Sequence, residues 1–429
     1  MRRVAITGIG LLTPLGVGTE ETWTALLGGR SAVAPIAAYD ASSLRTQLGG
    51  EITGFDAKAA REYVNRRSLR TMTRYDVLTS VAVEIARRDA DLEFGDDCAG
   101  RNALFTAAGK EISEPEHFQD VAVDVRDENG VVDMHRFGEE GMARVYPLFF
   151  IEGIQGASLF YVSEAYGLRG ANTYFAGTAE AGLQAIGRAF RAIKRGEADH
   201  AIAGGGDAPV CWWNMAKIDS LELMTTRNDL GARACRPFDV ERDGTVVGEG
   251  GAYLILEDLD GARARGARVY AEIVGFGSGT DIEHLFTPDP SGAGVVRAVQ
   301  GALREAGSEY AALDYVAAHA GGTRAGDASE ASALRALANG GAGPAVSSVK
   351  PATSHLVAAA GALNAAVAAL AVHHSAAPAT LNLEHVDPTC QGIEHITGSA
   401  REARISQALA LARGLEGQNV ALIVRAVEG

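Results

Sequence analysis

Two histidines and a lysine in the C-terminal half are the side chains best suited to chemistry. His319 ends the apolar segment Tyr315–His319, and Lys350 precedes His355 by five residues in SSVKPATSH. Histidine is the side chain that most often transfers protons in enzymes, but a lone histidine on an apolar segment is usually structural. The residue types alone leave both interpretations open.

The cysteines form no recognisable motif. Cys98, Cys211, Cys235 and Cys390 are scattered, with no CxxC pair and no histidine cluster beside them. This distribution favours reduced thiols and predicts no metal site.

The composition is that of an ordinary globular protein with 429 residues and a net charge of -15. That charge argues against general nucleic-acid binding, which needs a basic surface. The N-terminus MRRVAITGIG enters an apolar strand without a signal peptide, and we find no run of 18 apolar residues. We therefore expect a soluble, cytoplasmic protein without membrane contact.

One basic cluster interrupts the acidic chain. Arg66, Arg67, Arg70 and Arg74 fall in the stretch NRRSLRTMTR, which we expect on one helix. Such a cluster can steer an acidic partner protein, or it can be an ordinary solvated helix face.

Strands and helices must alternate to position these residues. The predicted strands are Val4–Ile9, Asn102–Ala108, Thr173–Gly177, Ala198–Gly204, Gly250–Glu257, Val269–Gly277, Tyr315–His319, Ala345–Val349 and Asn419–Arg425. The predicted helices are Thr19–Leu27 (capped by Thr19), Arg66–Arg87, Tyr146–Tyr166, Glu180–Arg195, Gly294–Ala306, Asp327–Leu337 and His355–Val372.

This alternation predicts an α/β fold with a buried, mostly parallel sheet covered by helices on both faces. Residues 110–146 differ, because they are polar and without periodicity, and Asp124–Gly130 has the composition of a turn. We interpret 110–146 as an insertion over the surface. Similar strand–helix pairs near the middle of 1–255 and 256–429 suggest two duplicated halves.

Three longer motifs resemble β-ketoacyl-[acyl carrier protein] synthases of the elongating, type II kind. They are the opening VAITGIGLLTPLG, the run Arg236–Gly244 followed by Gly248–Gly251, and Leu381–Leu383. The resemblance covers 1–109 and 147–429 and implies a thiolase-like, duplicated αβαβα fold in five layers, usually dimeric. It implies no cofactor other than the phosphopantetheine of an acyl carrier protein, which carries the substrates.

The resemblance also implies roles for individual residues. His319 and His355, with Lys350, match the residues that polarise a malonyl thioester carbonyl and promote decarboxylation. Glu152, in FFIEGIQG, falls in the family's dimer helix and is expected at the interface or in the pocket. Carrier proteins are acidic, so the arginine cluster is the expected docking site.

The nucleophile position departs from the family pattern. Family members carry a cysteine at the start of the central helix, where the helix N-terminus favours the thiolate. Counting back from Gly196–Asp199 places Ala179 there, and a gap of one residue would place Glu180 there instead. Thr178 could react in principle, but a threonine without an adjacent base is a weak nucleophile.

A second departure lies in the loop that gates the pocket in the family. The aligned residues are Gly414–Asn419, with Leu415 at the position of the gating phenylalanine and Glu416 in place of a glycine. Glutamate lacks the backbone freedom of glycine, so both the motion of the loop and the oxyanion geometry are expected to change.

These departures lead to three functional hypotheses. The first is a chain-length-factor-type subunit that pairs with a cysteine-bearing ketosynthase, or with itself, in type II polyketide (polyene or other reducing) or fatty-acid-like chain assembly. Aromatic-polyketide chain-length factors usually lose both histidines, which are kept here. The second is a malonyl-carrier-protein decarboxylase that supplies starter units, and the third is a repurposed acyltransferase or hydrolase. All three predict that the chain cannot condense alone.

Overall fold

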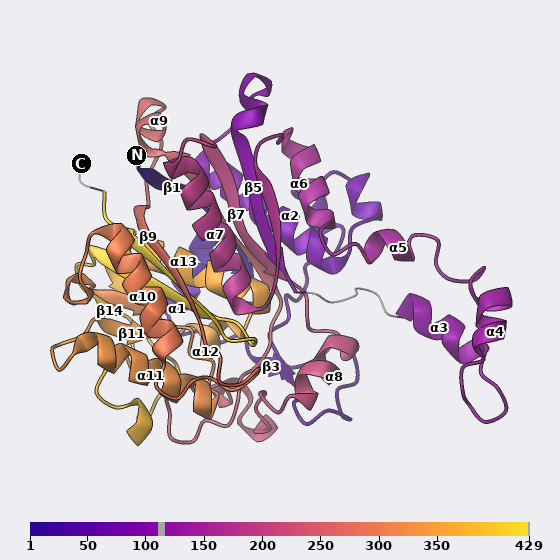
Figure 1. Cartoon of the computed structure of the whole chain (residues 1–429). Helices are drawn as coiled ribbons and strands as arrows, with labels where there is room; N and C mark the ends of the chain where they lie inside the picture. Colours follow the sequence, from indigo (N-terminus) through magenta and orange to yellow (C-terminus); the bar gives the residue numbers. More distant parts are fainter. Residues whose placement is uncertain (110–115, 428–429) are drawn as a thin grey trace.

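The computed structural model describes residues 1–109 and 116–427 (Figure 1). Its helices are α1 (Thr19–Leu27), α2 (Arg74–Ala90), α3 (Glu116–Asp124), α4 (Met134–Arg136), α5 (Phe149–Glu152), α6 (Ala157–Tyr166), α7 (Ala179–Lys194), α8 (Trp212–Ser220), α9 (Leu259–Ala264), α10 (Ala293–Ala306), α11 (Arg324–Ala338), α12 (Lys350–Thr353) and α13 (Ala360–His374). Its strands are β1 (Val4–Thr13), β2 (Gly16–Val17), β3 (Ala34–Pro35), β4 (Leu48–Gly49), β5 (Asn102–Ala108), β6 (Asn172–Ala176), β7 (His200–Asp207), β8 (Gly250–Asp258), β9 (Ala271–Thr280), β10 (Tyr315–Ala317), β11 (Ala345–Ser347), β12 (Ala376–Ala377), β13 (Glu394–His395), β14 (Arg401–Glu402), β15 (Gln407–Arg413) and β16 (Gln418–Arg425).

The strands of the main sheet join in the order β13-β11-β10-β15-β16-β9-β1-β8-β7-β5-β6, with β2 paired to β1. This order contains two matching sets, β1-β8-β7-β5-β6 and β9-β16-β15-β10-β11. In each set the first three strands are antiparallel neighbours and the last three are parallel neighbours. The strand order thus repeats in the two halves, although their division at residues 255 and 256 stays a prediction.

The sheet is mixed, so the expectation of a mostly parallel sheet was wrong. The physical reason is clearest at β15 and β16, which are joined by a tight turn over 414–417 and must therefore run antiparallel.

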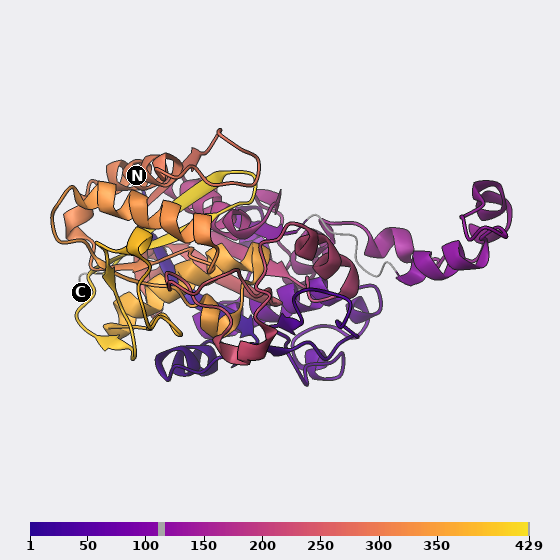
Figure 2. The same ribbon diagram turned by 90° about the horizontal axis from the view of Figure 1, so that it is seen from below.

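The elements stack in five layers (Figures 1 and 2). Helices α7 and α13 contact each other and strands of both sets, so they form the central layer. Helices α2 and α6 cover the outer face of the first set, and α10 with α11 covers the second. This is the expected thiolase-like αβαβα arrangement.

The central layer explains one strongly apolar segment. Val357–His374 is long and apolar enough to cross a membrane, but 83% of it is buried within the fold. Small residues on both helices let α7 approach this segment closely. A Cβ added at Gly182 of α7 would lie only 2.5 Å from the carbonyl oxygen of Ala358. The segment is a core helix.

The helix predicted over Arg66–Arg87 begins only at Arg74. Thr73 and Asp76 form a capping box that starts α2 there, while Ser68–Arg70 forms a separate 3₁₀ turn. The four arginines of the basic cluster therefore do not share one helix.

Three other predicted helices also differ at their boundaries. The helix expected over Tyr146–Tyr166 is divided into α5 and α6 by a segment that contains two glycines, which weaken a helix. The helix expected from His355 begins only at Ala360, because Val357 has a left-handed backbone (φ 42°). Helix α1 begins as predicted, but Gly18 is its N-cap, and the Thr19 hydroxyl instead donates to the Ile9 carbonyl at 2.6 Å.

Residues 116–156 project away from the five layers as an arm (Figures 1 and 2). The arm holds α3, α4 and α5, and a small core of Val121, Val125 and Phe137 lies near α3 and α4. The Asp127 side chain accepts the N–H groups of the turn that follows it, as the turn signature predicted. The predicted surface excursion is present, although 110–115 lie outside the described residues.

Candidate active site

The site is a cavity of about 790 Å³ between the two halves of the fold. Its lining includes both predicted histidines, His319 and His355, and both predicted gate residues, Leu415 and Glu416. Thr178 also reaches it. Ala179 and Lys350 are buried just behind this wall, with exposed fractions of 1% and 3%.

The predicted nucleophile position at the N-terminus of α7 holds only a methyl group. Ala179 is the first residue of the helix, directly after its N-cap Thr178. All four cysteines lie in the described residues, and none of them lines the cavity. The structure thus offers no thiol at the position where a helix N-terminus would favour a thiolate.

The next residue, Glu180, folds back over the start of its own helix. Its carboxylate accepts the Thr178 hydroxyl at 3.0 Å and lies within 3.3 Å of the Thr178 backbone nitrogen. A Cβ at Gly177 or Gly414 would lie 2.2 or 2.4 Å from its oxygens, so both glycines are needed to make room for it. Burial, reinforced by the Glu416 carboxylate, raises the pKa of Glu180.

The hairpin between β15 and β16 closes onto this helix terminus. The Leu415 N–H donates to the Thr178 hydroxyl at 3.0 Å, and that hydroxyl donates to Glu180. Gly417 has the left-handed backbone (φ 87°) that the tight turn requires. The Glu416 Oε2 atom is buried and has no hydrogen-bond partner among the described residues. Beside Ala179, Thr178, Glu180 and the Leu415 N–H are therefore bonded to one another, and Glu416 is not part of this group.

His319 follows β10 and is held on several sides. Its backbone N–H and that of Ala320 each donate to the Glu330 carboxylate at 2.8 Å. Its ring Nδ1 lies 3.3 Å from the Arg413 backbone nitrogen, and the Lys350 ammonium donates to its carbonyl. Burial, together with the nearby positive charge of Lys350, holds the pKa of His319 well below its usual value.

His355 follows the short helix α12 and faces His319. Its Nδ1 accepts the Val357 N–H at 3.0 Å, and the two imidazole centroids lie 5.5 Å apart. Burial and the charge of Lys350 lower the pKa of His355 to about 3. Burial also lowers the pKa of Lys350 to about 8.

These contacts define the protonation of both rings. Each Nδ1 accepts a backbone N–H, so each neutral imidazole carries its proton on Nε2. Two Nε2–H donors on the wall of one cavity can polarise a carbonyl oxygen without a proton transfer. This half of the site is suited to stabilising an enolate.

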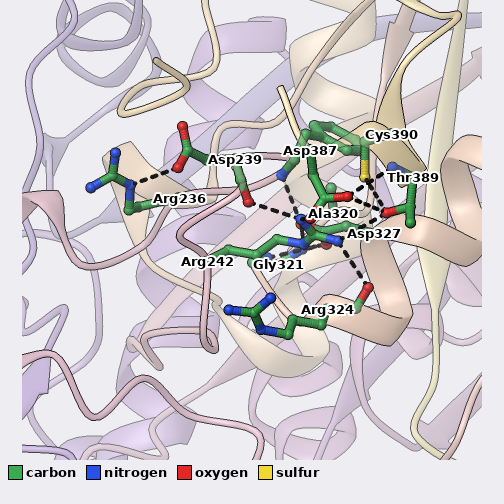
Figure 3. A network of polar contacts seen from close by, with 12 residues as sticks. Arg236, Asp239, Arg242, Ala320, Gly321, Arg324, Asp327, Asp387, Thr389 and Cys390 are labelled. Carbon is green, nitrogen blue, oxygen red and sulfur yellow. Dashed lines mark hydrogen bonds and ion pairs between the residues drawn. The ribbon is translucent and has the colours of Figure 1, made fainter. Parts of the chain in front are cut away.

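A buried ionic network supports the turn after His319 (Figure 3). Asp327 accepts the N–H groups of Gly321 and Gly322 at 3.1 and 3.2 Å. Arg242, which is 1% exposed at its side chain, pairs with Asp387 at 2.7 Å and lies 3.5 Å from Asp327. Burial raises the pKa of Asp327 to about 6. The sequence run Arg236–Gly244 therefore serves to position the histidine turn.

The predicted docking and interface residues lie away from the cavity. Arg66, Arg67 and Arg70 are exposed, whereas Arg74 pairs with Glu249 at 2.7 Å and also donates to the carbonyls of Phe55 and Ile52. Glu152 ends α5, and its side chain lies outside the described part of the structure.

Several polar residues of the cavity wall were missed by the sequence reasoning, Thr245 and Asn214 among them. Thr245 lies between the matched runs Arg236–Gly244 and Gly248–Gly251, and Asn214 lies on α8 beside two tryptophans. Only their polarity within apolar stretches could have drawn attention to them.

Known proteins share this architecture along the whole chain. The family model described as Beta-ketoacyl synthase, N-terminal domain, matches residues 1–262, and its C-terminal counterpart matches 270–384. The 3-oxoacyl-[acyl-carrier-protein] synthase 2 of Coxiella burnetii is 34% identical over 430 residues, covering 99% of each chain.

Solved structures agree with the sequence matches. The ishigamide ketosynthase/chain length factor superposes with a TM-score of 0.87 at 29% identity, covering 100% of both chains. AntDE:AntF, described as a type II PKS acyl-carrier protein in complex with its ketosynthase bound to the hexaketide, gives 0.87 at 26% identity, again over 100% of both chains. The chain therefore belongs to the β-ketoacyl synthase family, with a thiolase-like fold.

Proposed function

We propose that this chain is a non-acylating subunit of chain-length-factor type, which pairs with a cysteine-bearing ketosynthase in the cytoplasm. The observation that carries the proposal is the start of α7, where Ala179 stands at the nucleophile position and Leu415, Thr178 and Glu180 are bonded to one another. Condensation in this family passes through an acyl group on a nucleophile, which this helix terminus does not provide. Its pathway would be type II polyketide or fatty-acid-like chain assembly.

The open edge of β6 supports a partner of the same fold. β6 ends the strand order, and its residues are exposed or only half-buried. The neighbouring helix α6 exposes Phe160 by 67%, and α5 exposes Phe150 by 80%. An unpaired strand edge beside apolar side chains is a template for pairing with another sheet. The ishigamide ketosynthase/chain length factor is a solved relative whose description names such a pair.

The acyl carrier protein is the second proposed partner. Substrates of the family are carried on its phosphopantetheine, and Arg66, Arg67 and Arg70 are exposed charges in an otherwise acidic chain. Reversing Arg66 and Arg70 to glutamate should weaken salt-sensitive binding of the carrier protein, while Arg304→Glu on the outer helix α10 should not. Unchanged binding by the double variant would end this assignment.

The central test is acylation. The purified chain should form no acyl adduct by intact mass when incubated with acyl-carrier protein, and it should extend no chain alone. Adding a cysteine-bearing homologue should restore condensation and yield a stoichiometric heterodimer by size-exclusion chromatography. A stoichiometric acyl adduct on this chain, or a stable homodimer that ignores the homologue, would contradict the proposal.

A second function, malonyl-carrier-protein decarboxylation, is favoured by the two Nε2–H donors. That step needs carbonyl polarisation and not a thiolate. It predicts release of carbon dioxide from malonyl-carrier protein by the chain alone, abolished in His355→Ala and retained in an Arg304→Glu control. If carbon dioxide release survives the loss of His355, this second function is wrong.

A further inference from the structure

The mouth of the main cavity is marked by residues that line the cavity and are also exposed to solvent. They come from the end of α8, the loop after β9 and the start of α11, and they are Ser220, Glu222, Phe286, Thr287, Arg324 and Ala325. Substrates of this family are carried on an acyl carrier protein. A tethered chain that enters the cavity passes between these residues, so its carrier protein lies against the surface around them.

The loop after β9 exposes three large apolar side chains at this mouth. Ile282 is 86% exposed, Leu285 is 58% exposed and Phe286 is 43% exposed. Single exposed apolar residues are common on any protein surface. Three of them within five consecutive residues beside a cavity mouth form a patch, and such patches mark interaction sites.

This loop is held in place by polar contacts. The Asp281 N–H donates to the Gly417 carbonyl at 2.8 Å, and the buried Asp281 carboxylate pairs with Arg413. Within the loop, His284 Nδ1 accepts the backbone N–H groups two and three residues further on, each at 3.2 Å. The apolar side chains are therefore presented by a fixed turn, tied to the hairpin that closes on α7.

Arg324 adds a positive charge to the mouth. Its carbonyl accepts Arg242 at 3.1 Å, whereas its guanidinium makes none of the contacts drawn in Figure 3 and has no printed partner elsewhere among the described residues. It lies at the start of α11, where the helix dipole disfavours a cation. Glu222, the acid at the mouth, is already paired with Arg45 at 3.0 Å. Arg324 is thus the charged mouth residue that is open to an anionic partner.

We propose that the acyl carrier protein docks on this mouth patch, which consists of Ile282, Leu285, Phe286 and Arg324. The apolar side chains pack against the carrier surface around its phosphopantetheine, and Arg324 pairs with an acidic side chain of the carrier protein. The inference rests on the proposed function, in which this cavity takes carrier-borne chains, and it adds a second contact to the Arg66 cluster. The partner subunit is assigned to a different face, at β6.

The apolar half of the patch is tested by calorimetry with the full chain and an acyl carrier protein that carries an octanoyl-pantetheine amide. Ile282→Ser combined with Leu285→Ser should weaken binding about tenfold, because two side chains no longer bury apolar surface. Val240→Ser is the matched control, since Val240 is exposed but does not line the cavity, and it should bind normally.

The charged half has a test with a defined sign. Arg324→Gln should weaken carrier binding about threefold at low salt and less at high salt, whereas Arg304→Gln on α10 should not. Glu283 is an exposed acid between Ile282 and Leu285. Glu283→Gln should strengthen binding, since it removes a charge that repels an acidic carrier. Weaker binding by Glu283→Gln would overturn the assignment to an acidic partner.

Two further measurements identify the occupant. Free octanoyl-pantetheine amide, without the carrier protein, should bind the double serine variant and the unsubstituted chain equally. Weaker binding of the free amide would mean that the cavity itself has changed, and unchanged binding of the loaded carrier would mean that it docks elsewhere; either result overturns the inference. Loss of the heterodimer in size-exclusion chromatography would assign the patch to the partner subunit instead and would also overturn it.

The inference and the proposed function fail in different ways. If the unsubstituted chain binds no loaded carrier protein, the inference is wrong. The acylation and heterodimer experiments use no variant of the mouth patch, so they still decide the proposed function independently.

Discussion

The two walls of the cavity differ in what holds their polar groups. On the histidine wall, Glu330 and Arg413 hold His319 in place, and a buried ionic network supports the turn behind it. On the α7 wall, Ala179 has no reactive group, and one buried oxygen of Glu416 has no partner among the described residues. The β15–β16 hairpin contacts both walls, through Arg413 at His319 and Leu415 at Thr178, but the histidine wall is also held by Glu330 and the ionic network. Carbonyl polarisation on that wall therefore does not depend on a nucleophile at the start of α7.

The largest expected effect comes from trying to rebuild the α7 wall. Ala179→Cys alone should form no acyl adduct, because Glu180 and Glu416 place two carboxyl groups beside the new thiol and disfavour its thiolate. The triple variant, which combines Ala179→Cys with Glu180→Thr and Glu416→Gly, should become acylated by acyl-carrier protein. Intact mass should show a near-stoichiometric adduct on the triple variant and none on the single variant.

Two variants keep this experiment informative. Glu180→Thr with Glu416→Gly but without the cysteine is the matched control and should remain unmodified. If Ala179→Cys alone is acylated to completion, the α7 wall has lost only its nucleophile, and the contrast between the two walls is much smaller than the contacts indicate.

The next largest effect tests the support of the histidine wall. Arg242→Met keeps a long side chain but leaves Asp327 and Asp387 without their buried cation. Breaking a buried pair from one side costs about 3–5 kcal/mol of unfolding free energy. Denaturant unfolding should show this loss. Arg227→Met, which removes a solvent-exposed pair with Asp229, should leave the free energy of unfolding nearly unchanged.

A pH experiment tests whether His355 is neutral and buried. Its pKa falls from 6.5 in the unfolded chain to about 3 in the fold. At a pH between these two values, the unfolded chain binds a proton at this histidine and the folded chain does not. Acidification therefore lowers the free energy of unfolding by about 1.4 kcal/mol per pH unit for this group. His355→Gln keeps an acceptor for the Val357 N–H but cannot titrate.

The comparison between the two proteins reports mainly on that one group. The stability of the unsubstituted protein should fall relative to His355→Gln as the pH decreases below about 6.5, by about 1.4 kcal/mol per unit. The other buried acids titrate in both proteins and cancel in the difference, whereas His319, whose pKa the neighbouring His355 helps to lower, adds to the same loss in the unsubstituted protein. Parallel stability curves would mean that His355 is protonated as readily in the fold as in the unfolded chain.

The sequence predicted the fold class better than the sheet. β5 and α1 were predicted with their observed bounds, because apolar strands and helical spacing are local signals. The central strand β15 was missed, since QALALAR is rich in helix-favouring alanine and leucine, and only the neighbours of the strand fix it.

Long-range contacts explain what else was missing at the site. The closure of Leu415 onto Thr178 joins residues 237 positions apart, which no local pattern encodes. The Glu180 carboxylate bonds Thr178 from only two positions away, but the fold of its side chain depends on the room left by Gly177 and the distant Gly414. The threonine beside the slot therefore has the carboxylate neighbour that the sequence reasoning did not expect, but its hydroxyl also accepts the Leu415 N–H. The difference between the paired Arg74 and the exposed Arg66, Arg67 and Arg70 likewise depends on a distant residue. Arg74 pairs with Glu249, which lies far along the chain.

The smallest effect concerns backbone strain beside His355. Ser354 has φ 65° and ψ 176°, a region that glycine occupies and other residues avoid at a cost of about 1–3 kcal/mol. Its hydroxyl is buried near Gly50 and Gly248 and has no partner in the part of the chain that the structure describes. Ser354→Gly should therefore stabilise the fold by about 1 kcal/mol after the entropy that glycine adds to the unfolded chain. Ser354→Ala keeps the strained backbone and should gain less. If both variants gain equally, the unpaired hydroxyl and not the backbone is the source of the strain on the histidine wall.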